Sequence, residues 1–276
     1  MSDELPRSRA ARAAAERALI RVVHHYGGRP EFVLLGGLVP DLLCSTSGMV
    51  HSGTTDVDVQ VNLEIAAGTV NAQRLESALL NAEFEPDAQR VWRWRSDDGD
   101  GRAIIKFELL ADLDDQPAGA TVVFAGCADL GAANLRGTRF AVSDIEVRQL
   151  RVRVGGVEHA AEINVTGLGG FLMAKCAAAH SRRKPKDWYD IAYVLLHNDA
   201  GGVEAAAQTV LARFAPDLAS VRTALDDLRD NFADTAAQGA VAYADEMGSN
   251  HPDIERRLLL ADSVAAIDEY HRLLTA

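Results

Sequence analysis

Cysteine is scarce in this chain of 276 residues. Its three cysteines, Cys44, Cys127 and Cys176, are widely spaced, and no two of them form a Cys-x-x-Cys pair. An odd number of isolated cysteines argues against a disulfide framework and against a structural zinc site. We therefore expect reduced thiols and a cytoplasmic protein.

Long apolar runs are also missing. No stretch approaches the ~20 apolar residues that a membrane-spanning helix needs. The segment from Met1 to Arg12 is polar and charged and lacks the apolar core of a signal peptide. These two features predict a soluble protein that does not interact with a membrane.

Positive charge is in deficit. The chain has 28 Lys and Arg residues against 40 Asp and Glu residues, which gives a net charge of -12. This balance excludes a broad electrostatic coating of nucleic acid, so any RNA contact needs a local basic patch. The hydrophobic content of 48% is ordinary for a globular protein, and the length allows two domains or one large domain.

The first motif is a short apolar strand that ends in two glycines. Glu31 to Leu35 is predicted as the strand, and Gly36-Gly37 lets the backbone turn sharply and approach a ligand closely. Pro40 suits the first turn of a helix whose free N–H groups would face that ligand. The alternative is that the Gly-Gly pair is only a turn.

A second strand carries acidic side chains on one face. Asp56 and Asp58 alternate with Val57 and Val59, so the two carboxylates share a face about 6.6 Å apart and can share one or two hard cations. The alternative is a solvated strand face or a turn. The order of strand, Gly-Gly, helix start and acidic strand favours phosphoryl or nucleotidyl transfer, with glycine amides on the phosphates and Mg²⁺ on the aspartates.

These residues resemble the nucleotidyltransferase superfamily related to DNA polymerase beta, and within it the AbiEii/AbiGii-type toxins, which include the MenT toxins. The family pattern is a strand ending in Gly-Gly or Gly-Ser, a spacer, and a Thr or Ser shortly before Asp-x-Asp. It stands here as Gly36-Gly37 and Thr54-Thr55-Asp56-Val57-Asp58. The spacer from Leu38 to Gly53 is longer than usual. Gly37 stands where many relatives have Ser, which removes one hydroxyl contact to a phosphate.

A third acid is expected on a neighbouring strand. Residues 90–95 and 103–110 are predicted as a hairpin, in which Lys106 and Glu108 share one face of an otherwise apolar strand. In the superfamily that the first motif resembles, a third acid completes the metal site or serves as general base. The alternative is an edge-strand ion pair between Glu108 and Lys106.

Three other side chains have two interpretations each. Trp92 and Trp94 either stack on a base or belong to the core. His51, in the polar loop of residues 45–53, either touches a phosphate or is simply solvated.

A second cluster follows where the apolar pattern changes to a helical period. A helix is predicted from Leu168 to the residues before Pro185, and another helix after it. Lys175 and Arg182 are seven residues apart and share one helix face. A triphosphate or an RNA end fits such a concentration of positive charge. The other basic residues of the cluster are Arg183, Lys184 and Lys186.

The alternative is a basic helix C-terminus that complements the helix dipole, followed by Asp187 as N-cap and Asp190 in the first turn. It explains Lys175, in the middle of a helix, less well. The stretch also resembles the second signature of the AbiEii-type family, which is a Lys on a helix, an Arg/Lys-rich turn and an Asp-x-x-Asp pair. The two signatures together cover roughly residues 30 to 197.

The resemblance implies an NTP-dependent nucleotidyltransferase that uses Mg²⁺. For some members the acceptor is the 3′ end of tRNA, and an antitoxin protein restrains the toxin. The implied metal ligands are Asp56, Asp58 and Glu108, and these act in catalysis together with Lys175. The implied nucleotide-binding residues are Gly36, Gly37, Thr55, Lys175, Arg182, Arg183, Lys186 and Asp187.

The expected fold is α+β, with a mixed nucleotidyltransferase sheet, flanking helices and a C-terminal helical bundle. Residues 1–166 would form the catalytic domain and residues 167–276 the helical domain that carries the second signature. The predicted elements include helices over residues 8–26, 69–82, 221–232 and 254–274, and a hairpin around Gly155-Gly156.

Two other functions remain open. One is a regulatory module that keeps the fold and binds a nucleotide or a protein partner without turnover, which the absent serine and the long spacer motivate. The other is nucleotidyl transfer to a small molecule or to a protein hydroxyl, which the modest basic content allows.

Overall fold

A computed structural model describes residues 9–61, 69–97 and 104–276. Contacts between residues divide the chain into two compact units. The sheet unit consists of Met1–Leu38 and Gly53–Thr166, and the helical unit consists of Val39–Ser52 and Gly167–Ala276. The chain therefore passes between the units at three points, after residues 38, 52 and 166.

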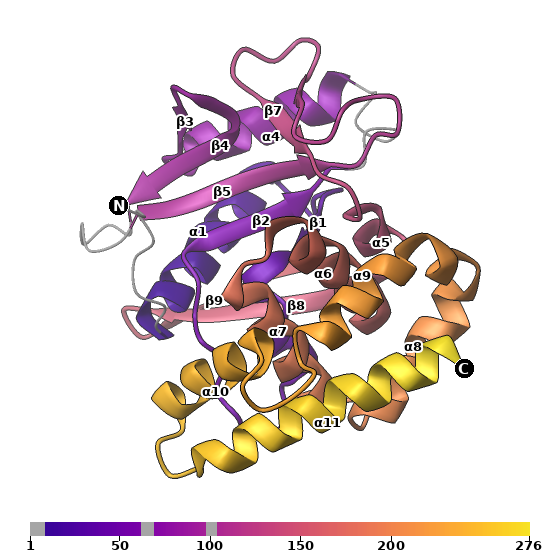
Figure 1. Ribbon diagram of the computed structural model, residues 1–276. Coiled ribbons are helices and arrows are strands. Elements are labelled where there is room, and N and C mark those ends of the chain that lie inside the picture. Colours follow the sequence, from indigo (N-terminus) through magenta and orange to yellow (C-terminus); the bar gives the residue numbers. More distant parts are fainter. Residues whose placement is uncertain (1–8, 62–68, 98–103) are drawn as a thin grey trace. The chain divides into compact units, whose positions relative to one another are not determined.

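A single mixed sheet forms the core of the sheet unit (Figure 1). Along the main path the strand order is β3-β4-β5-β2-β1-β9-β8, with β7 beside β5 and β6 beside β7. β2 runs parallel to β5 and antiparallel to β1, while β1 runs parallel to β9. The predicted α+β class with a mixed sheet is confirmed. The strands within the described residues are β1 (Val33–Leu35), β2 (Asp56–Gln60), β3 (Glu85–Asp87), β4 (Arg90–Asp97), β5 (Ile104–Ala111), β6 (Thr121–Val123), β7 (Gly131–Asn134), β8 (Ile145–Val154) and β9 (Val157–Thr166).

Helices α1 (Arg9–Tyr26) and α4 (Thr69–Asn81) pack against each other, and α1 crosses β2, β5, β8 and β9. Arg21 of α1 donates a hydrogen bond to Ser96, which identifies the sheet face that α1 covers. Val57, Val59 and Phe107 are fully buried. Because side chains alternate along a strand, Asp56 and Asp58 lie on the opposite face.

The opposite face has a smaller apolar cluster. Leu35, Leu110, Ala133 and Ala141 are buried there together, and Ala141 comes from the short helix α5 (Arg139–Val142). Trp92 packs against this cluster, and Trp94 is fully buried. The core interpretation of Trp94 is therefore confirmed.

Hairpin β8–β9 extends the sheet from Val154 and Val157 to Ile145 and Thr166. Its turn, Gly155-Gly156, has φ values of 57° and 84°. Positive φ at both central residues suits a two-residue hairpin loop and favours glycine there. The hairpin predicted from the sequence is confirmed.

Six longer helices make up most of the helical unit within the described residues. Helix α6 packs against α7, α8 and α9, and α11 packs against α7, α8, α9 and α10. The fully buried rings of Tyr189, Tyr193, Tyr243 and Tyr270 lie in this unit. The helices are α6 (Leu168–Arg182), α7 (Pro185–His197), α8 (Val203–Phe214), α9 (Leu218–Asp230), α10 (Gln238–Asn250) and α11 (Arg256–Thr275), together with the single turns α2 (Pro40–Leu43) and η2 (Ala215–Asp217).

The segment Val39–Ser52, which the sequence places within residues 1–166, packs with these helices. Asp199, just after α7, accepts hydrogen bonds from the backbone N–H and the hydroxyl groups of Ser45 and Thr46 at 2.6 to 3.0 Å. The Tyr193 hydroxyl donates to the carbonyl of Met49 at 3.0 Å. Because these anchors repeat along the segment, it forms part of the helical core.

Asp199→Ala tests this anchorage. Burial raises the pKa of Asp199, but the hydrogen bonds from Thr46 and Ser45 outweigh it and hold the pKa below 3.8. A lowered carboxyl pKa stabilises the fold above the unfolded value, and this contribution disappears as the pH falls through the folded value. We expect Asp199→Ala to lower the free energy of unfolding at pH 7 by about 1 kcal/mol, a modest value because the side chain is exposed.

The measurement is urea unfolding at pH 7 and at pH values approaching 3, with the exposed Asp253→Ala as control. The difference from wild type should shrink as the pH falls. A loss that is the same at all pH values would show that the carboxylate charge is not what holds the segment.

Candidate functional site

The acidic residues predicted from the sequence share one sheet face in the sheet unit. Asp56 and Asp58 are half-buried on β2, between fully buried valines. In the parallel pairing of β2 with β5, Asp58 is directly in register with Glu108. Side chains in register on neighbouring strands project to the same face, about 5 Å apart. The structure therefore brings all three acids together on the face opposite α1.

Two cations lie on the same face. Arg93 of β4 is in register with Glu108, and its Nε donates to Glu108 Oε1 at 2.6 Å. Lys106 is in register with Asp56, and its Nζ lies 3.5 Å from Asp56 Oδ1. These five residues, Asp56, Asp58, Arg93, Lys106 and Glu108, are called the charged face below.

The alternative of an edge-strand ion pair between Glu108 and Lys106 is wrong. Strand β5 lies between β4 and β2, so it is not an edge. Lys106 pairs with Asp56 because their strands place them side by side. Glu108 pairs instead with Arg93, a residue to which the sequence analysis gave no role.

The donor chemistry of the charged face fits a hard divalent cation. Carboxylate oxygens are the ligands that Mg²⁺ takes from proteins, usually one or two of them together with waters and substrate phosphates. Asp56 and Asp58 supply such oxygens. Within the described residues, no three His, Cys, Asp or Glu side chains are grouped closely enough to hold a metal by themselves. Glu108 is paired with Arg93 and Asp56 with Lys106, so a metal ion held by the two aspartates would have to compete with Lys106.

Glycine is required beside Asp58 for two reasons. Gly36 has φ of 78°, and a Cβ built there would lie 2.0 Å from Asp58 Oδ2. At Gly37 a Cβ would lie 3.1 Å from Cβ and Cγ2 of Thr54. Thr54 Oγ1 accepts a hydrogen bond from the N–H of Asp56 at 3.0 Å. The carbonyl of Thr55 accepts one from the backbone N–H of Lys106. The glycine turn and the threonines therefore hold the start of β2 in place.

The helix expected after Pro40 is much shorter than a phosphate-binding helix. Pro40 does stand at its first turn, but α2 ends at Leu43 and has no side-chain cap. A single turn carries little of the aligned dipole that attracts anions. The predicted helix start at Pro40 is confirmed, but a helix of this length would contribute little to binding a phosphate.

The basic cluster of the second signature is built around a buried lysine in the helical unit. Lys175 on α6 is only 6% exposed. Its Nζ donates to Asp187 Oδ1 at 3.1 Å and to Asp190 Oδ2 at 2.6 Å, both on α7. Arg182 Nη2 also donates to Asp187 Oδ1, at 2.8 Å. These ion pairs join α6 to α7.

Lys175 keeps its charge in this setting. Burial lowers the pKa of Lys175, but the negative charges of Asp190 and Asp187 outweigh burial, and the net pKa is raised. The ammonium group is thus matched by two buried carboxylates. The alternative in which Asp187 is the N-cap of α7 is wrong, because Asp187 lies within the first turn and is fully buried. The N-cap of α7 is Lys184, with Pro185 in the first turn.

His51 joins the same network. Its Nε2 lies 3.0 Å from Asp190 Oδ1, and its ring stacks on Tyr189 with centroids 4.9 Å apart. The side chain is buried, so the prediction that it is simply solvated is wrong. Arg183 is exposed and pairs with Asp227 at 2.9 Å, and Lys186 is half-buried.

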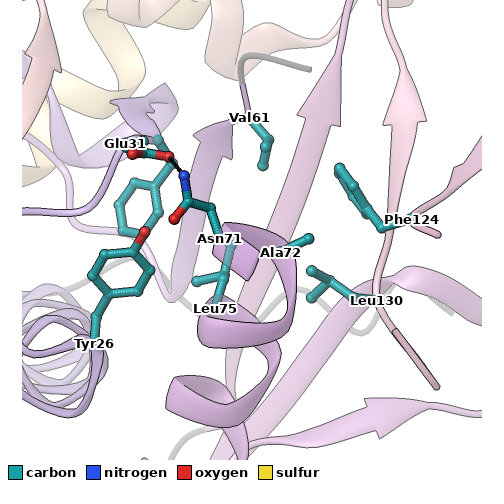
Figure 2. A pocket seen from close by; sticks show the side chains of 9 residues that line it. Tyr26, Glu31, Val61, Asn71, Ala72, Leu75, Phe124 and Leu130 are labelled. Atoms are coloured by element: carbon teal, nitrogen blue, oxygen red, sulfur yellow. Dashed lines mark hydrogen bonds between the residues drawn. The ribbon is translucent and has the colours of Figure 1, made fainter. Parts of the chain in front are cut away.

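Figure 2 shows a cavity in the sheet unit that contains none of the predicted site residues. Tyr26, Asn71, Leu75 and Phe124 are among the residues that line it, and Asn71 donates to Glu31 at 2.6 Å. Its volume of about 20 Å³ has room for one water molecule. The cavity is therefore too small for a nucleotide.

Comparison with known families connects the end of the sheet unit and most of the helical unit to one of them. A family model described as nucleotidyl transferase AbiEii toxin, Type IV TA system, matches residues 137–270. The resemblance to the AbiEii family that the sequence indicated is confirmed over these residues. The match includes Lys175, Arg182, Asp187 and Asp190 and begins after the charged face. No curated protein matches the chain.

The AbiEii match supports a nucleotidyltransferase toxin of a toxin–antitoxin system. Such a toxin implies an NTP substrate and a cognate antitoxin. Among the described helices, none combines the length and the apolar character needed to cross a bilayer.

Gly36→Ala tests the turn beside Asp58. The added methyl group would collide with the carboxylate in addition to straining the backbone, so we expect a loss of about 2 kcal/mol or more in the free energy of unfolding. Gly48→Ala is the matched control, because Gly48 has a similar φ of 71° and open space at its Cβ position. Chemical unfolding of both variants is the measurement. Equal losses would contradict the close approach of Asp58 to Gly36.

Lys175→Met tests the buried network around Lys175, which lies within the segment that the AbiEii model matches. Removing the ammonium leaves two buried carboxylates without their main counter-charge, so we expect a loss of about 3 to 5 kcal/mol in stability. Arg183→Met removes an exposed ion pair and should cost less than about 1 kcal/mol. Urea unfolding compares the two. A Lys175→Met protein as stable as Arg183→Met would show that the pairs contribute little.

Proposed function

We propose that this chain is an NTP-dependent nucleotidyltransferase whose metal-binding residues are Asp56 and Asp58. The observation that carries the proposal is the register of Asp58 with Glu108 on one face, beside a turn that only glycine fits. Two aspartates on one strand face are suited to holding a divalent ion against a phosphate. The AbiEii match supports the same reaction class.

In the proposed reaction an acceptor hydroxyl attacks the α-phosphorus of an NTP. The bond from the α-phosphorus to its bridging oxygen breaks, pyrophosphate leaves, and the hydroxyl proton passes to Glu108 or to solvent. A bound Mg²⁺ would supply Lewis-acid activation and charge neutralisation. Asp56 and Asp58 would bind this ion and orient the triphosphate. The backbone at Gly36, Gly37 and Thr55 admits the phosphates.

The residues of the second signature contribute to the same proposal. Arg182, Arg183 and Lys186 offer positive charge for the triphosphate or for an RNA end. Lys175 and Asp187 would act from within their buried network, which fixes the helix ends that carry these cations. As an acceptor we propose the 3′ end of tRNA, because a local basic patch is the contact that a chain of net charge -12 can offer to RNA.

A second candidate function is a nucleotide-binding module without turnover. It is favoured by the ion pairs that already occupy Glu108 and Asp56 and by Gly37 in place of a serine. Calorimetry that shows tight NTP binding, together with no product in any divalent metal, would support this function over catalysis.

The enzymatic proposal is tested with labelled NTPs, Mg²⁺ or Mn²⁺, and total tRNA. Wild-type protein should transfer label, and Asp56→Asn or Asp58→Asn should reduce transfer by at least about 100-fold. Asp115→Asn, an exposed acid of the sheet unit, serves as control. Absence of transfer in every metal, or transfer that persists in Asp56→Asn, would remove the proposal.

A further inference from the structure

The charged face is arranged in two rows across neighbouring strands. In one row Arg93 of β4, Glu108 of β5 and Asp58 of β2 stand side by side. In the next row Lys106 of β5 stands beside Asp56 of β2. Arg93 therefore lies beside Glu108, the proposed proton acceptor, and Lys106 lies beside Asp56, a proposed metal ligand.

These ion pairs are partly shielded from solvent. The side chains of Arg93, Glu108, Lys106 and Asp56 are 15% to 19% exposed. Charge pairs at such positions interact more strongly than pairs in open water. Three carboxylates and two cations leave a net charge of one negative on the face. A free divalent ion thus meets carboxylates whose charge is mostly matched already.

Arg95 shows that not every cation of these strands takes part. It lies two residues from Arg93 on the same strand, yet it pairs with Asp87 at 2.6 Å. Its side chain is 48% exposed. Removing Arg95 therefore changes the charge of the strand without releasing any of the three acids.

We propose that Arg93 and Lys106 are positioning residues that hold Glu108 and Asp56 and make metal binding depend on the nucleotide. A free divalent ion must compete with the Lys106 ammonium for the Asp56 carboxylate, while the Arg93 guanidinium matches the charge of Glu108, which stands in register with the other proposed ligand, Asp58. A metal that arrives with a triphosphate brings anionic oxygens, which receive the displaced cations. This inference rests on the proposed function, because it takes Asp56 and Asp58 as the metal ligands.

The proposal predicts opposite effects on two affinities. Arg93→Gln and Lys106→Gln should bind free Mn²⁺ on the order of tenfold more tightly than wild type, because one competing charge is gone. The same variants should bind an NTP more weakly, with a raised KM. Arg93→Lys should retain part of the wild-type behaviour, and Arg95→Gln should change neither affinity by more than about twofold, because exposed charges are screened.

The measurement is Mn²⁺ titration of the full chain by electron paramagnetic resonance, with and without a non-hydrolysable NTP analogue. Thermal unfolding checks that each variant is folded. If Arg93→Gln does not fold, Lys106→Gln and Arg93→Lys carry the test. Cations that only stabilise the sheet would alter unfolding and leave both affinities unchanged, and this result would overturn the proposal.

The outcomes separate this inference from the proposed function. One outcome overturns the inference alone. In it, Mn²⁺ binds in the presence of nucleotide and requires Asp56, but the Gln variants show no gain in affinity for free Mn²⁺. Tight binding of free Mn²⁺ by wild type also overturns it alone. Absence of Mn²⁺ binding by wild type in both conditions overturns the metal site and with it the proposed function.

Discussion

The parallel pairing of β2 with β5 is the constraint on which the candidate site depends. It fixes Asp58 beside Glu108 and Asp56 beside Lys106. A shift of one residue would turn these side chains to the other face. The buried valines of β2 prevent such a shift, because they pack into the core on the α1 side. Gly36, directly after β1, leaves room for the Asp58 carboxylate. Apolar packing on one face thus organises charge on the other.

The two units use ion pairs in different ways. On the charged face, each pair is partly open to solvent and joins side chains of adjacent strands, so a metal or a phosphate can compete for either partner. In the helical unit, Lys175 and Asp190 are buried and linked further to His51. Breaking one partner of a buried network is costly. The first group therefore suits exchange with ligands, and the second suits a fixed arrangement of α6, α7 and the segment before Gly53.

Much of the fold could be predicted from local patterns. The hairpin at Gly155-Gly156, the alternation on β2 and the break between α6 and α7 each depend on a few neighbouring residues. The contacts within the candidate site were harder to predict, because the residues that pair there are distant in sequence. Arg93 and Glu108 meet only through strand register, and His51 and Asp190 are 139 residues apart. Residues 45–52 have the composition of a loop, and nothing local indicates that helices would bind them.

The AbiEii match supports the reaction class through residues 137–270, while the proposed chemistry lies on β2 and β5. The most direct test is a crystal structure with Mn²⁺ and a non-hydrolysable NTP analogue, examined by anomalous scattering at the manganese edge. We expect a manganese ion coordinated by Asp56 and Asp58 and by triphosphate oxygens. Manganese bound elsewhere, with Asp56 still paired to Lys106 and Glu108 still paired to Arg93, would contradict it.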